Sequence, residues 1–159
     1  MFGLFTAHVF TDPALGMLNH ARGYWRGAID LGEGLVPLAL AGDREAPAAE
    51  ALAEARALCE RMPRWQAPRR QALFAHYQPY AEAVATGAKM PDTDIPFPQI
   101  SSPADIDAHA SLAFVSIVPE AGQWITELGY ATDWDVEHTP GARFAGERFL
   151  ELCGSILKR

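Results

Sequence analysis

The stretch GMLNHARGYWRGAIDL, residues 16–31, decides the fold class. Two runs that suit β-strands, 16–21 and 24–31, lie on either side of Arg22-Gly23. A two-residue link that contains glycine is typical of a tight turn between antiparallel strands. Residues 1–42 are therefore predicted to form antiparallel β-structure.

The run LVPLALAG, residues 35–42, continues this β-region after the glycine-rich Gly32-Glu33-Gly34. Pro37 has no amide hydrogen to donate to a neighbouring strand. The sequence therefore predicts that this strand lies at an edge of the sheet or carries a bulge at Pro37.

A helical region follows over residues 47–88, because apolar side chains recur there at helical spacing. Proline disrupts the interior of a helix. Pro63 is accordingly predicted to end a first helix, and Pro79 to break or kink a second one that Gly87 caps. Two helices joined by a few residues are expected to pack as an antiparallel pair.

The remainder of the chain is predicted to return to β-structure. Residues 89–103 contain four prolines and suit a surface connector, which leads to a short helical turn capped by Ser101 or Ser102. Three strand-like runs follow, at 112–119, 124–134 and 142–156. The prediction is an α+β fold with a mostly antiparallel sheet of N-terminal and C-terminal strands and a helical pair packed on one face.

Length, charge and composition limit the kinds of partner and location that can be expected for this chain. The 159 residues suit a single domain, 1–159, and the formal charge of −7 disfavours a phosphate-binding surface, so no nucleic acid is expected as a partner. RWQAPRR, residues 64–70, is interpreted as a solvated face, and the tryptophans as core. No run approaches the roughly 20 apolar residues that cross a bilayer. With no signal peptide and two isolated cysteines, expected to be reduced and buried, the predicted compartment is the cytoplasm.

The run TDWDVEH, residues 132–138, is the candidate site. On an extended strand, Asp133, Asp135 and Glu137 would share a solvated or partner-facing side, with Trp134 and His138 on the core side. The alternating carboxylates also suit a calcium loop. That match fails, because an EF-hand register would need glycine where His138 stands. The prediction is a binding surface of these five residues, with no metal, no cofactor and no catalytic residue.

Several pieces of the chain, among them GYWRGAIDL, VPLALAG and the run Trp134-Asp135-Val136-Glu137-His138, resemble a family of uncharacterised bacterial domains. A glycine often follows that histidine in the family, whereas Thr139-Pro140-Gly141 follow it here. The family has no settled activity. It is similar to small acidic immunity proteins that neutralise bacterial toxins, so the resemblance implies a role as a toxin antagonist.

Three functions remain open at this stage. The first is a non-catalytic cytoplasmic protein that binds another protein, which is expected to be basic because this chain is acidic. The second is a metal-assisted hydrolase that uses Asp133, Asp135, Glu137 and His138. The third is a homo-oligomeric structural domain that pairs strands through the 35–42 edge.

Overall fold

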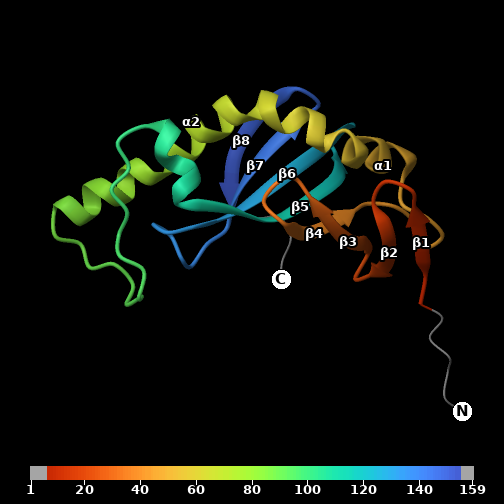
Figure 1. Ribbon diagram of the computed structural model, residues 1–159, viewed down its shortest axis with the longest axis horizontal. Coiled ribbons are helices and arrows are strands. Elements are labelled where there is room, and N and C mark those ends of the chain that lie inside the picture. The colour runs from red at the N-terminus through yellow and green to blue at the C-terminus, as the bar shows by residue number, and fades with distance from the viewer. Residues whose placement is uncertain (1–6, 155–159) are drawn as a thin grey trace, which may run out of the picture.

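The computed structural model describes residues 7–154; residues 1–6 and the end of the last predicted strand, 155–156, lie outside the described part. An α+β fold with a mostly antiparallel sheet is confirmed (Figure 1). The elements follow in the order β1 (Val9–Asp12), β2 (Gly16–Ala21), β3 (Tyr24–Asp30), β4 (Leu35–Leu40), α1 (Ala49–Arg56), α2 (Leu58–Ala85), η1 (Pro103–Ala108), β5 (Ala110–Glu120), β6 (Gln123–Thr132), β7 (Pro140–Ala145) and β8 (Arg148–Gly154).

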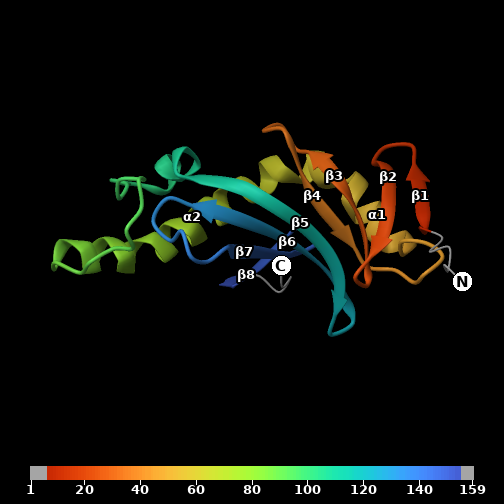
Figure 2. The same ribbon diagram turned by 90° about the horizontal axis from the view of Figure 1, so that it is seen from below.

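The eight strands form one sheet in which the spatial order follows the chain. All neighbouring strands are antiparallel except β4 and β5, which run parallel and pair only through residues 38–40 and 115–117. We call this short parallel pairing the seam. It joins two antiparallel halves, β1–β4 and β5–β8, which lie side by side in Figure 2.

The predicted hairpin at the start of the chain is confirmed. β2 and β3 pair antiparallel up to Ala21 and Tyr24, so Arg22 and Gly23 alone form the turn. Both residues have positive φ, 54° and 82°. This is the backbone of a type I′ turn, whose twist matches that of the flanking strands.

The sequence predicted that the strand with Pro37 lies at an edge or carries a bulge. This was wrong for β4 as a whole, but Pro37 does mark a part of β4 that is paired on one side only. β4 lies inside the sheet between β3 and β5, so it does not offer a free edge for a second copy of the chain. Pro37 pairs with Ala28 of β3, while the seam with β5 begins only at Leu38. The proline therefore sits where one side of β4 is unpaired, and its missing amide hydrogen breaks no ladder.

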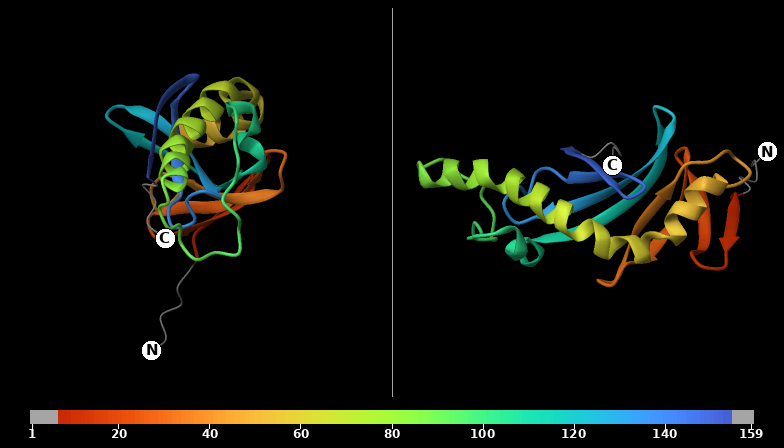
Figure 3. Two further views of the ribbon diagram at one scale, coloured as in Figure 1. Left: turned by 90° about the vertical axis from the view of Figure 1, so that its left-hand side faces the viewer. Right: turned by 90° about the horizontal axis from the view of Figure 1, so that it is seen from above.

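The expected antiparallel pair of helices is replaced by two helices that run end to end (Figure 3). One residue, Ala57, separates α1 from α2, and a hairpin of helices needs a longer loop. The break at Ala57 also shifts the buried stripe, so that Leu58 is buried and Cys59, predicted to be buried, is exposed.

α2 passes through three prolines, Pro63, Pro68 and Pro79, without ending at any of them. Each proline leaves one carbonyl, four residues earlier, without its helical hydrogen bond. These carbonyls belong to exposed residues, which solvent can reach; they are Cys59, Arg64 and Ala75. Burial of the opposite face against the sheet holds the helix together, which sequence alone did not reveal.

The core lies between α2 and the sheet. Trp25, Trp65 and Trp134 are fully buried, as predicted for tryptophans of this chain. Trp65 stacks on Phe144 of β7 with ring centres 4.2 Å apart. Arg69 is buried one helical turn further on, so the interpretation of 64–70 as a solvated face holds for Arg64, Gln66 and Ala67 but was wrong for Trp65 and Arg69.

The C-terminal turns of α2 extend past the sheet and meet the connector that follows (Figure 1). Gly87 has φ 89°, and the amide of Ala88 donates to the carbonyl of Ala83, which confirms the predicted glycine cap. Residues 88–102 contain no helix or strand, as expected. Ser102 then caps η1 through a capping box with Asp105, and no helix within residues 7–154 has the length and apolar run to cross a membrane.

Candidate functional site

The candidate run 132–138 forms a loop, and the extended strand expected there was wrong. β6 ends at Thr132, which pairs with Ala110, the first residue of β5. Beyond that point β5 gives way to η1, and β7 begins only at Pro140. Residues 133–139 therefore have no neighbouring strand on either side, and the alternation of faces is lost.

Asp135 is buried in this loop, 7% exposed, instead of facing solvent. The hydroxyl of Tyr80, on α2, donates to its Oδ2 at 2.6 Å. The backbone amide of His138 donates to Oδ1 at 3.2 Å, and the imidazole Nδ1 of His138 lies 2.9 Å from the same oxygen. Asp135 thus ties the loop to α2 and closes the loop upon itself.

These contacts shift the pKa values of Asp135, Tyr80 and His138. Burial raises the pKa of Asp135, but the hydrogen bonds from Tyr80 and His138 outweigh it, so this pKa lies below its usual range. The same hydrogen bond raises the pKa of Tyr80 to about 12. Asp135 also raises the pKa of His138. The arrangement favours a carboxylate beside an imidazolium, which is a structural ion pair.

Trp134 points into the core, as the sequence predicted. Its indole Nε1 donates to Nδ1 of His76 on α2 at 3.0 Å, and its ring meets Tyr77 edge to face. The hydrogen bond requires an unprotonated Nδ1, and burial lowers the pKa of His76 in agreement. Trp134 and Asp135, adjacent in sequence, therefore both attach the loop to α2.

The remaining acidic residues point elsewhere. Asp133 lies against His109, with Oδ2 2.9 Å from Nδ1, while Glu137 and His138 are exposed. Among residues 7–154 no three His, Cys, Asp or Glu side chains are placed to hold a metal ion together. The four groups proposed for a metal-assisted hydrolase therefore do not converge on one point. Asp133 pairs with His109, Asp135 pairs with His138, and Glu137 is exposed to solvent.

A hollow of about 180 Å³ lies between this loop and the connector, both of which contact α2. The connector contributes Met90, Ile95 and Phe97, and the loop contributes Trp134 and Val136. We call this hollow the apolar groove. Ile95 and Val136 are 44% and 46% exposed, which is unusual for large apolar side chains.

Acidic residues lie in both segments that form the apolar groove. Asp133 lines it, Asp92 and Asp94 are exposed on the connector, and Glu137 is exposed on the loop. Lys89 is the one lysine or arginine in residues 88–102 and 133–139. The connector residues were missed by sequence reasoning, although apolar side chains spaced between its prolines were a usable signal.

Comparison with protein-family models, with curated proteins and with solved structures returned no match. The family resemblance drawn from the sequence therefore stays a prediction.

Proposed function

We propose that this chain is a non-catalytic binding protein that holds a basic segment of another protein in the apolar groove. The observation that carries the proposal is the exposure of Ile95 and Val136 in a groove that Asp133 lines, on segments that carry three further exposed carboxylates. Contiguous apolar surface of this kind, rimmed by charge, marks interaction sites in other proteins.

The polar groups of the loop support a binding role over a catalytic one. A general acid or base has to be free to exchange a proton with substrate. The carboxylate of Asp135 is instead occupied by Tyr80 and His138, and that of Asp133 faces His109. These pairs hold the loop against α2 and η1, and so keep Val136 in position.

The charge of the chain supports the choice of partner. With a net charge of −7 and carboxylates around the groove, the protein attracts cationic partners over long range. An apolar anchor that enters the groove would supply most of the affinity, because buried anchors dominate binding energies. An acidic protein that binds a basic partner in this way could act as a cytoplasmic antagonist of a basic protein toxin.

A displayed library of random peptides tests the proposal with the purified protein. We expect the selected peptides to combine a large apolar residue with neighbouring Lys or Arg, and to bind more weakly as salt rises. Binding should fall at least about tenfold in Ile95→Ser and Val136→Ser, the loss expected for a buried anchor.

Leu35→Ser is the matched control, because Leu35 is an exposed apolar residue in the other half of the sheet. It should bind the selected peptides as the unmodified protein does. Selection of no peptide, or of peptides that the two groove variants retain equally well, would overturn the proposal. Glu137→Gln, which changes charge alone, should reduce the salt dependence with a smaller loss of affinity.

A further inference from the structure

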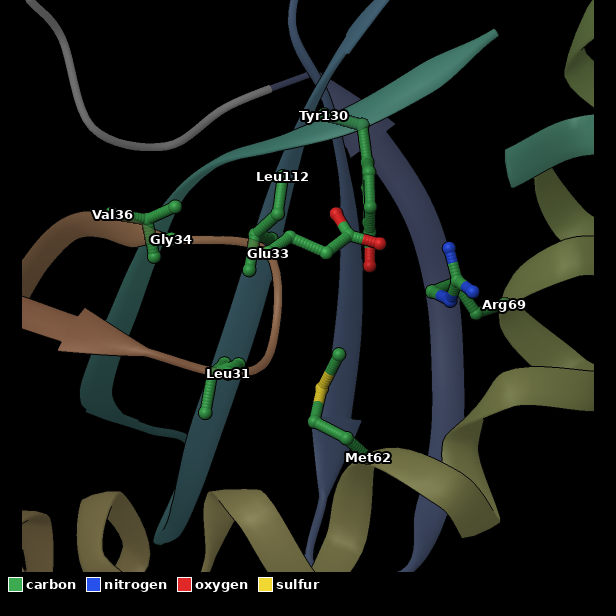
Figure 4. A pocket seen from close by; sticks show the side chains of 8 residues that line it. All are labelled: Leu31, Glu33, Gly34, Val36, Met62, Arg69, Leu112 and Tyr130. Carbon is green, nitrogen blue, oxygen red and sulfur yellow. The ribbon is translucent and has the colours of Figure 1, made fainter. Parts of the chain in front are cut away.

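A second cavity of about 50 Å³, partly open to solvent, lies where β4 and β5 separate (Figure 4). We call it the split cavity. The strands pair only through the seam, and β5 carries an irregularity between Leu112 and Phe114. Val36 of β4 and Leu112 of β5 line the space that opens between them, and Met62 of α2 covers it.

Two polar side chains on the wall of the split cavity have buried atoms without a hydrogen-bond partner in the described chain. They are Nε of Arg69 and the hydroxyl of Tyr130, in residues that are 8% and 2% exposed. Folded proteins rarely leave such groups unpaired unless a ligand or water pairs with them. The split cavity therefore offers two donors to an acceptor oxygen.

One nitrogen of the Arg69 guanidinium is already engaged. Its Nη2 donates to Asp107 of η1 at 2.8 Å, and Arg70 binds the other oxygen of the same carboxylate. The guanidinium carbon lies 5.4 Å from the ring centre of Tyr130. Arg69 is close enough to interact with the Tyr130 hydroxyl and opposes the rise in its pKa that burial causes, but neither Arg69 Nε nor that hydroxyl has a partner at full hydrogen-bonding distance and angle.

Glu33 supplies an acceptor on the opposite side. Its side chain extends from the β3–β4 loop toward Tyr130 (Figure 4), and its charge acts on that hydroxyl. Gly32 and Gly34 flank it with φ of 110° and 97°, a backbone that glycine adopts readily. This backbone directs the carboxylate over the cavity.

The charges around the split cavity balance. The guanidiniums of Arg69 and Arg70 both pair with the carboxylate of Asp107, and the exposed Glu33 adds a second carboxylate to the lining. An ionic ligand would add a net charge beside the buried Arg69, which is costly. A neutral group that accepts hydrogen bonds on one side and donates them on the other fits these partners.

We propose that the split cavity binds a small molecule through a primary carboxamide group. The carbonyl oxygen accepts from Arg69 Nε and from the Tyr130 hydroxyl, and the amide nitrogen donates to the Glu33 carboxylate. The apolar walls, among them Leu31 and Val36, contact the carbon chain. The site is separate from the apolar groove and does not depend on the function proposed for it.

Three probes of equal size test this assignment by NMR: propionamide, propionate and propylammonium. The signal to follow is the Nε–H of Arg69, which reports directly on an acceptor at this atom. We expect propionamide to shift it saturably, and the two ions to bind more weakly or not at all.

Substitutions of the lining residues test which of them bind propionamide. Tyr130→Phe removes one donor that has no well-aligned partner in the described chain, so the protein should fold normally and bind propionamide about tenfold more weakly, the worth of one hydrogen bond. Glu33→Gln provides an amide that can donate, so the preference should move toward propionate. Tyr24→Phe, a half-buried tyrosine remote from the split cavity, is the control and should change nothing.

Two results would overturn the proposal. If no probe shifts the Arg69 signal saturably, water alone satisfies the donors and the split cavity is not a ligand site. If propionate binds the unmodified protein more tightly than propionamide, the site selects anions, and Glu33 does not take part in recognition.

Discussion

Two loops of this chain, 133–139 between β6 and β7 and 31–34 between β3 and β4, each place a carboxylate near α2 and differ in the hydrogen bonds around it. In the first, the buried carboxylate of Asp135 has its hydrogen bonds complete. In the second, Glu33 extends toward buried donors that have no partner among the described residues. The comparison teaches that density of charge in the sequence does not locate a ligand site; incomplete hydrogen bonding does so better.

The largest expected effect comes from Trp134→Ala in the first loop. The side chain is fully buried and donates to His76, so its loss should lower the free energy of unfolding by about 3–5 kcal/mol. Urea denaturation measures this. A loss below about 1 kcal/mol would mean that the loop is not a structural element, and the comparison would fail.

Asp135→Asn should have the next largest effect. The amide would direct a donor at Tyr80 or His138, where an acceptor is needed, and we expect a loss of about 1–3 kcal/mol. Glu137→Gln, an exposed carboxylate two residues away, is the matched control and should stay within about 0.5 kcal/mol. Equal effects of the two changes would contradict the distinction between a partnered and a solvated carboxylate.

The two histidines of the first loop's network should respond to pH with opposite signs. The pKa of His76 is lowered from 6.5, so its contribution to stability is full above pH 6.5 and is lost as the pH falls through the lowered value. The pKa of His138 is raised from 6.5, so its contribution is full below pH 6.5 and is lost as the pH rises through the raised value.

Unfolding free energies at pH 7.5 and 5.5 separate these contributions. On acidification, His76→Gln should lose less stability than the unmodified protein, and His138→Gln should lose more. The same sign for both variants would show that the imidazoles do not have the protonation states assigned here.

The smallest effect is expected in the second loop. Glu33→Gln breaks no hydrogen bond of the described chain, so the free energy of unfolding should change by no more than about 0.5 kcal/mol. Thermal melts of the two proteins should then overlay closely. A loss comparable to that of Asp135→Asn would mean that Glu33 is a structural partner of Arg69 or Tyr130, and the two loops would be alike.

Much of the fold was predictable because its signals are local. The turn at Arg22-Gly23, the helix C-cap at Gly87 and the helix N-cap at Ser102 each depend on residues close in sequence. The path of α2 through Pro63 and Pro79 was not predictable in this way, because burial against a distant sheet outweighs the missing hydrogen bonds.

The candidate site was predicted in part. The rest depends on contacts between residues that are far apart in the sequence. The sequence identified Trp134 as core, but it placed Asp135 in solvent, since its partner Tyr80 lies on another element. The apolar groove and the split cavity each combine segments far apart in the chain. No spacing rule brings Arg69 next to Tyr130, so a sequence-based search passes over the split cavity.

The seam has a consequence for the rate at which this protein folds. Leu38 and Val115 pair across almost half the chain, whereas the strands of each half pair with close neighbours in sequence. Each half can form early, but the seam has to wait for a long loop to close, and such late, non-local pairing slows folding. A truncation such as Val115→Ala should therefore accelerate unfolding more than it slows folding, if the seam forms after the transition state.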